Sequence, residues 1–305
     1  MHKLLVLVGP TGVGKTELSL RLADAFNIPI INADSRQIFR EIPIGTAAPT
    51  AEQMSKVKHY FVGSHSICDY YSASMYEQEV ISLINKLSCT TDNEVVALLT
   101  GGSMMYIDAV CNGIDDIPTV DNQTREWMKQ RLAREGLPSL VEELKKLDPE
   151  HWALVDRNNP RRVVHALEIC HMTGKTYTSF RKNEKKQRPF EIIKIGVNRP
   201  REELYERINR RVLQMIGNGM VKEARMMYSM RELNALNTVG YKELFEHLDG
   251  TITLEEAICK IQSNTRRYAR KQLTWFKRDE TIQWFSLDKD SIDSIIEYCR
   301  ENILA

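Results

Sequence analysis

The sequence has 305 residues, long enough for one large domain or two modest ones, and 42% are hydrophobic, enough for a buried core. Its 42 Lys and Arg residues nearly balance 41 Asp and Glu residues, so affinity for nucleic acid must come from local clusters of charge. Six cysteines without a C-x-x-C pair argue against a disulfide framework and a zinc module. The apolar start LLVLV is too short for a membrane span or signal sequence, and we expect a cytoplasmic protein.

Short apolar runs predict the strands in the first part of the chain. Residues 3–8, 28–33 and 94–99 end in Gly, Asp or Thr-Gly-Gly and are typical of buried parallel strands. Between the first two runs, Leu18 and Leu22 recur at helical spacing. This order of strand, helix and strand predicts an α/β fold.

A phosphate loop lies between the first predicted strand and helix. Residues 9–16, GPTGVGKT, fit the pattern G-x-x-x-x-G-K-[ST]. Small residues let successive backbone N–H groups converge on phosphate oxygens at a helix N-terminus. Lys15 adds a cation, and the Thr16 hydroxyl would bind Mg²⁺. The pattern leaves the ligand open, because a diphosphate would fit as well as ATP.

Asp34 directly follows the second predicted strand, and the residues allow two interpretations. An NTPase presents a metal-binding carboxylate in this place, usually through a water molecule. Alternatively, the carboxylate could cap a helix that begins near Ser35. Spacing alone leaves both interpretations open.

From about Gly113 the sequence predicts consecutive helices without a strand. Asp121 and Asn159 are suitable N-caps for two of them. Gly136 and Gly174 are expected to end helices. This segment therefore has the pattern of an all-helical insertion.

The α/β pattern resumes after the insertion. FEIIKIGV and IQWFSL predict two further strands, with helical patterns between them. We therefore expect a P-loop NTPase-like parallel sheet core flanked by helices, formed by residues 1–112 and 190–305, with an all-helical insertion domain over residues 113–189.

Basic residues gather in three places. Residues 266–278 contain six cations and no acid, and Arg266 and Arg270 share a helix face. The other groups are Arg161 with Arg162 and His165, and Arg207 with Arg211. A solvated helix face can give this pattern, but in a chain of near-zero net charge it also resembles a surface that follows a sugar-phosphate backbone.

Seven segments together resemble the tRNA dimethylallyltransferase (tRNA isopentenyltransferase) family. They are GPTGVGKT, INADSRQIF…PIGTA, LLTGGSMMYIDAV, NNPRRVVHALEI, ERINRRV, NTVGYKEL and TRRYARKQLTWF. Apart from the phosphate loop each is weak alone, but the series has the family's order and approximate spacing over essentially the whole chain. The chain lacks the C-terminal Cys/His finger of eukaryotic relatives, so it resembles the bacterial type.

The resemblance implies transfer of a dimethylallyl group from dimethylallyl diphosphate to N6 of the adenosine 3′ of the anticodon, with release of diphosphate. The phosphate loop would then bind a leaving group. The implied partners are the tRNA anticodon stem-loop and dimethylallyl diphosphate, with no membrane, and the implied cofactor is Mg²⁺ bound by Thr16. We expect a monomer.

The resemblance also assigns residues. Asp34 would accept the N6 proton, while Arg211 and Thr11 would act on the donor. The implied diphosphate-binding residues are Gly9, Pro10, Thr11, Gly12, Val13, Gly14, Lys15 and Thr16. The implied tRNA-binding residues are Asp34, Ser35, Arg36, Gln37, Ser103, Arg125, Arg161, Arg162, Val163, Val164, His165, Asn237, Thr238, Val239, Gly240, Tyr241 and Lys242.

Two other functions share the phosphate loop. An adenylate dimethylallyltransferase would use the same loop and aspartate on free nucleotides. A nucleotide-switched RNA-binding protein would hold ATP or GTP in the loop and bind Mg²⁺ through Asp34. The helical insertion and the basic helix faces favour tRNA as the substrate.

Overall fold

The computed structural model describes residues 2–182 and 184–304. The chain forms two compact units. Unit 1 comprises Met1–Cys111 and Gln187–Ala305, and unit 2 comprises Asn112–Lys186. Within the described ranges, no helix combines the length and apolar character needed to cross a membrane.

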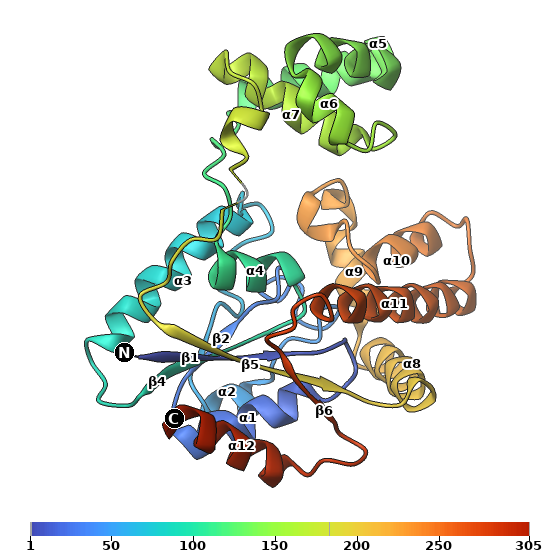
Figure 1. Cartoon of the computed structure of the whole chain (residues 1–305). Coiled ribbons are helices and arrows are strands. Elements are labelled where there is room, and N and C mark those ends of the chain that lie inside the picture. Colours follow the sequence, from blue (N-terminus) through green and yellow to red (C-terminus); the bar gives the residue numbers. More distant parts are fainter. Residues whose placement is uncertain (1, 183, 305) are drawn as a thin grey trace. The chain divides into compact units, whose positions relative to one another are not determined.

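Unit 1 is built on a six-stranded parallel sheet with strand order β3-β2-β4-β1-β5-β6 (Figure 1). The strands are β1 (Lys3–Val8), β2 (Ile30–Asn32), β3 (His59–Tyr60), β4 (Val95–Thr100), β5 (Glu191–Asn198) and β6 (Gln283–Ser286). The predicted α/β class and five of these strands are confirmed. The edge strand β3 was not predicted, because two residues are too few to show a periodic pattern.

Helices cover both faces of the sheet (Figure 1). Leu5 and Leu7 of β1 lie in one core with residues of α1 (Lys15–Phe26) and α12 (Ile292–Leu304). Leu4, Val6 and Val8 lie in a second core with residues of α3 and α4. Since β1 is buried on both faces, its sequence is a continuous apolar run instead of an alternating one. The bounds of these helices are Ala73–Ser88 for α3 and Met104–Asn112 for α4.

The remaining helices of unit 1 form a third core beside the sheet. They are α8 (Arg201–Gly217), α9 (Met220–Met227), α10 (Tyr241–Leu248) and α11 (Leu254–Phe276), with short 3-10 turns at Tyr228–Met230 and Asn234–Leu236. The short helix α2 (Ala51–Lys56) has no buried residue and lies outside this core. Val212, Met220, Leu244 and Ile261 are buried together there. This core holds α8, α10 and α11 around the pocket described below.

Unit 2 is helical, as predicted. It contains α5 (Asn122–Leu147), α6 (Pro149–Leu154), α7 (Pro160–Thr173) and a 3-10 turn at Thr178–Phe180. Asp121 and Asn159 are the N-caps of α5 and α7, where their side chains accept the N–H groups of Thr124 and Arg162. Gly136 leaves the helical conformation within α5 with φ of 76°, and Gly174 ends α7 with φ of 68°. The capping predictions are therefore confirmed.

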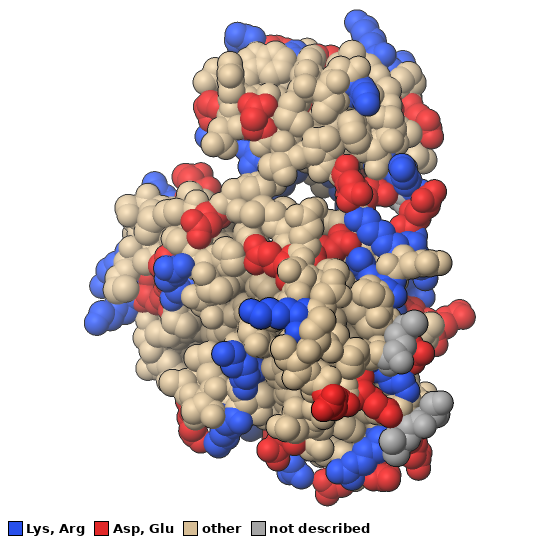
Figure 2. Space-filling model, turned by 90° about the vertical axis from the view of Figure 1, so that its left-hand side faces the viewer, with Lys and Arg blue, Asp and Glu red and all other residues tan. Residues whose placement is uncertain are grey.

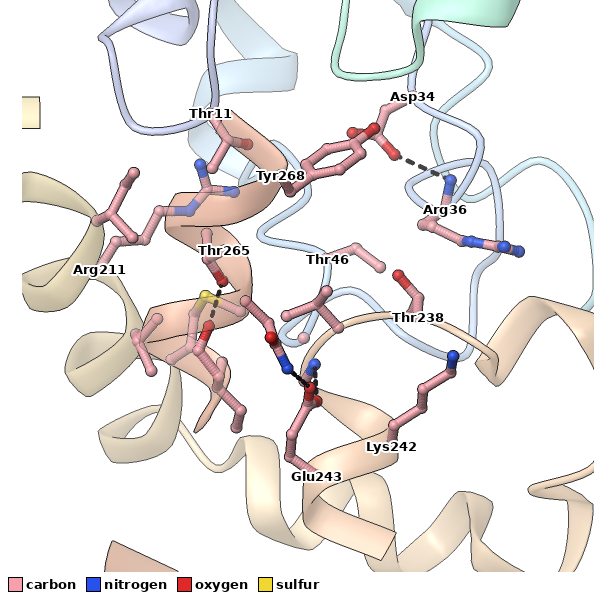
Figure 3. Close-up of a pocket in the computed structure, with 18 of the residues that line it drawn as sticks. Thr11, Asp34, Arg36, Thr46, Arg211, Thr238, Lys242, Glu243, Thr265 and Tyr268 are labelled. Carbon is pink, nitrogen blue, oxygen red and sulfur yellow. Dashed lines mark hydrogen bonds between the residues drawn. The ribbon is translucent and has the colours of Figure 1, made fainter. Parts of the chain in front are cut away.

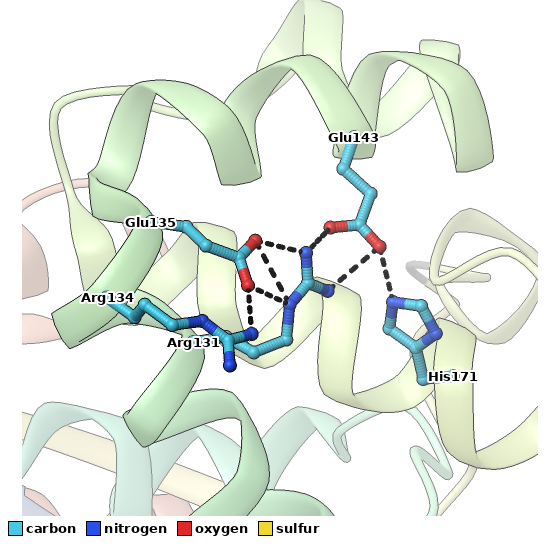
Figure 4. A network of polar contacts seen from close by, with 5 residues as sticks. All are labelled: Arg131, Arg134, Glu135, Glu143 and His171. Atoms are coloured by element: carbon cyan, nitrogen blue, oxygen red, sulfur yellow. Dashed lines mark hydrogen bonds and ion pairs between the residues drawn. The ribbon is translucent and has the colours of Figure 1, made fainter.

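A network of charged side chains links α5 to α7 in unit 2 (Figure 4). The guanidinium of Arg131 lies 2.6 Å from a carboxylate oxygen of Glu135 and 2.8 Å from one of Glu143. Glu143 in turn lies 2.7 Å from Nε2 of His171. Hydrogen bonds from Arg131 and then Arg134 lower the pKa of Glu135 to about 2. Arg131 is therefore the centre of the network.

Replacing Arg131 with methionine should lower the thermal midpoint of unit 2 by about 4–8 °C, because two carboxylates lose a shared charge-assisted partner. Calorimetry of the full chain measures this shift. Arg134→Met is the matched control, since Arg134 bonds the same Glu135 but is 76% exposed. Equal midpoints for the two variants would contradict a structural role for the Arg131 network.

The parallel sheet determines where the candidate site forms. The carboxyl ends of β1, β2 and β4 meet at one edge and lead into the phosphate loop, Asp34 and Gly101. A Cβ on Gly101 would lie 2.2 Å from the carbonyl carbon of Ala33, so only glycine permits the close approach of these two chain segments. Ligands of open α/β sheets bind at such an edge.

Candidate active site

The phosphate loop connects β1 to the N-terminus of α1. Gly14 is the N-cap residue of α1 and has φ of 115°, a left-handed conformation that favours glycine. Because Gly14 has no side chain to cap the helix, the N–H groups of the first turn are suited to an anion. A Cβ on Gly12 would lie 2.8 Å from Cγ1 of Ile208, so the loop packs tightly against α8.

Two arginines bind the carbonyl oxygens of the phosphate loop. Nε of Arg207 donates to the carbonyl oxygen of Gly12 at 2.9 Å, and Nε of Arg199 donates to that of Val13 at 2.9 Å. Both contacts fix the peptide planes of the loop. The sequence placed Arg207 and Arg211 on one side of a helix, and the structure directs that side to the site, since Arg207 contacts the loop and Arg211 lines a pocket.

The Lys15 side chain folds back over the phosphate loop. Its Nζ donates to the carbonyl oxygens of Gly9 at 2.7 Å and Pro10 at 3.0 Å. Burial, with a smaller contribution from Arg211, lowers the pKa of Lys15 to about 7, and Asp34 acts in the opposite direction. Burial likewise lowers the pKa of Arg211. Two half-buried cations with lowered pKa values are suited to an anionic ligand, which would favour their charged forms.

Asp34 holds the turn that follows β2. Its Oδ1 accepts the backbone N–H groups of Arg36 at 2.9 Å and Gln37 at 3.3 Å. The helix expected near Ser35 does not form, so the helix-cap interpretation is wrong, and residues 35–38 form turns instead. Oδ2 packs against Gly102, where a Cβ would lie 2.7 Å from it. One oxygen of Asp34 therefore has a structural role, and the carboxylate also lines the pocket.

A pocket of about 450 Å³ brings together many of the predicted site residues. Figure 3 shows Thr11, Arg211, Tyr268 and Asp34 toward one end and Thr238, Lys242 and Glu243 toward the other. The predicted residues that line it are Thr11, Asp34, Ser35, Arg36, Ser103, Arg211, Asn237, Thr238, Val239, Gly240 and Lys242. These residues come from five separate segments of the sequence, and all of them lie in unit 1.

Other predicted residues support the pocket from outside its lining. Gln37 donates to the carbonyl oxygens of Thr46 and Ala47 at 3.0 and 3.1 Å and so shapes that loop. Tyr241 is fully buried, and its hydroxyl donates to Glu223. Tyr241 therefore presents no exposed side chain for direct contact with RNA, whereas Gln37 is half-buried.

The remaining predicted residues belong to unit 2. Arg161 and Arg162 are exposed at the start of α7, whereas Val163 is fully buried in the core of the unit. Val164 and His165 are half-buried, and Arg125 lies in the first turn of α5. If this segment contacts RNA, the contact must come from residues other than Val163.

Glu243 of α10 and Tyr268 of α11 line the pocket and were missed by the sequence analysis. Tyr268 donates its hydroxyl to the carbonyl oxygen of Gly102 at 2.8 Å, and burial raises its pKa. Glu243 accepts the N–H of Gly240 and the amide of Asn264, each at 2.7 Å. Both are polar side chains on the buried face of a helix, and this pattern in the sequence could have indicated them as site residues.

The arrangement combines an anion site with a carboxylate. Lys15 and Arg211 supply positive charge, and the loop amides supply donors at the start of α1. Asp34 is close enough to influence the pKa values of both cations. Such a site can hold a phosphorylated ligand while a carboxylate accepts a proton from a second reactant.

The sequence matches a family model described as IPP transferase over residues 37–279. It is 59% identical over 300 residues to tRNA dimethylallyltransferase 1 of Bacteroides fragilis, covering 98% of each chain. It is 56% identical over 304 residues to tRNA dimethylallyltransferase 2 of Parabacteroides distasonis, covering 100% of each.

Solved structures agree with these matches. The full-length tRNA isopentenylpyrophosphate transferase of Bacillus halodurans is 35% identical with a TM-score of 0.72, and the match covers 100% of this chain and 97% of that one. A eukaryotic dimethylallyltransferase acting on tRNA has a TM-score of 0.81 at 23% identity, over 100% of this chain and 80% of that one, which supports the fold. With its phosphate loop, Asp34 and Arg211 gathered at one edge of the sheet, this chain belongs to the IPP transferase family.

Proposed function

We propose that the chain transfers a dimethylallyl group from dimethylallyl diphosphate to N6 of the adenosine 3′ of the anticodon in tRNA, releasing diphosphate. The observation that carries the proposal is the pocket that holds Asp34 together with Thr11 and Arg211 beside the phosphate loop. The names of the relatives, which are 56–59% identical, support the same reaction.

The phosphate loop has the properties needed to stabilise a leaving group. As the C–O bond of the donor breaks, negative charge grows on the diphosphate. The N–H groups at the start of α1, Lys15 and Arg211 are donors fixed before the reaction, and such donors stabilise developing charge without reorganisation. Thr11 places a hydroxyl group at the same end of the pocket.

Asp34 is suited to accept the proton that N6 loses as it attacks. Its Oδ1 is held by two backbone N–H groups, which fixes the carboxylate and leaves Oδ2 as the oxygen for proton transfer. An adenine stacked in an anticodon loop must be flipped to reach this depth. Loop bases are already partly unstacked, which makes flipping less costly than in a duplex.

Mg²⁺ fits the phosphate site as an ion held mainly by its ligand. Thr16 is exposed in the first turn of α1, where its hydroxyl would bind the ion. Among residues 2–182 and 184–304, no cluster of three His, Cys, Asp or Glu side chains could hold a metal. Mg²⁺ with few protein ligands takes its other oxygens from phosphate and water, and when bound it would offset charge on the diphosphate.

The tRNA is proposed to contact both units. Residues 237–242 line the pocket or lie beside it, with Lys242 exposed. Figure 2 shows basic and acidic side chains interspersed over one face, so binding depends on particular arginines and lysines more than on a single field.

Replacing Arg161 and Arg162 together with glutamine should weaken tRNA binding and reduce the slope of log K against log salt by roughly 1.5, because two phosphate contacts are lost. Filter binding at several salt concentrations measures the slope. Lys289→Gln, an exposed lysine of unit 1, is the control and should leave it unchanged. An unchanged slope for the double variant would show that α7 does not contact RNA.

The proposal is tested by incubating the protein with labelled dimethylallyl diphosphate, Mg²⁺ and either bulk tRNA or AMP. We expect label in tRNA. Label in AMP alone would favour an adenylate dimethylallyltransferase. Tight binding of ATP or GTP without transfer would favour a nucleotide-switched RNA-binding protein.

A further inference from the structure

Gln272 of α11 is a completely buried amide that makes two hydrogen bonds, both to distant parts of the chain. Its side chain is 0% exposed. Its Oε1 accepts the backbone N–H of Thr11 at 2.8 Å, and its Nε2 donates to the carbonyl oxygen of Gly102 at 2.8 Å. One side chain therefore connects the phosphate loop to the loop that follows β4.

The loop after β4 in turn contacts Asp34. Gly102 packs against Oδ2 of Asp34, and the next residue, Ser103, accepts the backbone N–H of Ser35 with its hydroxyl at 2.8 Å. The carbonyl oxygen of Gly102 also accepts the hydroxyl of Tyr268, one helical turn before Gln272. Through these contacts, α11 holds the phosphate loop and the Asp34 carboxylate at a fixed separation.

The bond to Thr11 also affects the loop itself. Gln272 accepts the backbone N–H of Thr11, so Thr11 does not offer this N–H group to a ligand. Thr11 lines the pocket, where its hydroxyl group can act on a ligand instead. Glutamine suits the bridge, since it offers one acceptor and one donor from a single planar group. Loss of either hydrogen bond would leave a buried polar group without a partner.

We infer that Gln272 is a positioning residue for prenyl transfer, which sets the distance between the leaving group on the phosphate loop and the Asp34 carboxylate. The inference rests on the proposed function. Gln272 is fully buried and does not line the pocket. Its effect is on alignment, and misplacement of reacting groups by about 1 Å can reduce a rate by roughly 100-fold.

Gln272→Met tests the inference, because methionine has a similar length and volume but does not replace the two amide hydrogen bonds. We expect the single-turnover rate of transfer to fall at least tenfold, with the affinities for dimethylallyl diphosphate and tRNA within about threefold of wild type. Gln262→Met is the matched control, since Gln262 lies on the same helix and donates to the carbonyl oxygen of Asn209 outside the pocket. The control should retain the wild-type rate.

Gln272→Glu adds a readout that a merely structural role would not move. An ionised carboxylate can accept from Thr11 but cannot donate to Gly102, whereas the protonated acid can do both. Burial raises the pKa of such a carboxyl group. The rate of this variant relative to wild type should therefore rise as the pH falls, measured at a temperature where both proteins are folded.

The outcomes separate the inference from the function. A wild-type rate in Gln272→Met, or a loss fully explained by donor affinity or by unfolded protein, would overturn the positioning role. A pH-independent ratio for Gln272→Glu would also overturn it. Failure of the wild-type protein to label tRNA would instead overturn the proposed function.

Discussion

Asp34→Asn should reduce the rate of prenyl transfer by roughly 10²–10⁴-fold while leaving tRNA binding nearly intact. Asparagine keeps an oxygen that can accept the N–H groups of Arg36 and Gln37, so the turn after β2 is retained. What it removes is the basic carboxylate oxygen beside Gly102. A lower rate in this variant would then result from the loss of the proton acceptor and not from a change in the turn.

Single-turnover labelling of tRNA with saturating donor measures this effect, and filter binding measures the affinity for tRNA. Asp69→Asn provides a matched control, because Asp69 also holds a turn, accepting the N–H of Ser66 at 2.8 Å, but is exposed and lies outside the pocket. Asp69→Asn should transfer at the wild-type rate. Near-normal turnover of Asp34→Asn would remove Asp34 from the base role.

Features that depend on neighbouring residues were predictable from the sequence. The caps at Asp121 and Asn159 and the helix-ending glycine at Gly174 are local, so a few residues determine them. The phosphate loop is equally local, since the strand, the glycines and the helix start lie within residues 3–16. The parallel sheet followed from apolar runs that are buried on both faces.

Features that depend on distant contacts were not predictable. Gln272 binds residues that lie 261 and 170 positions earlier in the chain, and nothing near Gln272 in the sequence indicates either partner. Gln272 lies in the basic segment of residues 266–278, which suggested a surface for RNA. Within that segment, however, Arg266 donates to Asn209 of α8 at 2.6 Å. Helical spacing predicts which residues share a face, but not what that face contacts.

The role of Asp34 falls between these cases. Its place after β2 was predicted, but spacing left open a metal ligand and a helix cap, and only the family resemblance implied a catalytic base. The turn formed through Oδ1 excludes the helix cap, and the pocket places the carboxylate with Arg211 and Thr11. A carboxylate beside an anion site suits the joining of two reactants, as the proposed transfer to an acceptor requires.

Lys15→Met should reduce transfer by roughly 10²–10³-fold and should also abolish a proton uptake that accompanies donor binding to the wild-type protein. Burial and Arg211 lower the pKa of Lys15 to about 7 in the site without ligand. A bound diphosphate would favour the charged ammonium and raise that pKa. Above about pH 7, the lysine must therefore gain a proton as the donor binds.

The sign of the pH dependence follows from this linkage. As the pH rises above the pKa of about 7, the free protein is increasingly neutral at Lys15, so donor affinity should fall by up to about tenfold per pH unit. Calorimetric titrations near pH 8 in two buffers of different ionisation enthalpy measure the proton uptake directly, and the donor's own phosphate is already ionised there. Lys289→Met is the control and should keep both the uptake and the pH dependence. Because the uptake requires a lysine that is neutral before binding, its absence in the wild-type protein would show that Lys15 is charged before the donor binds.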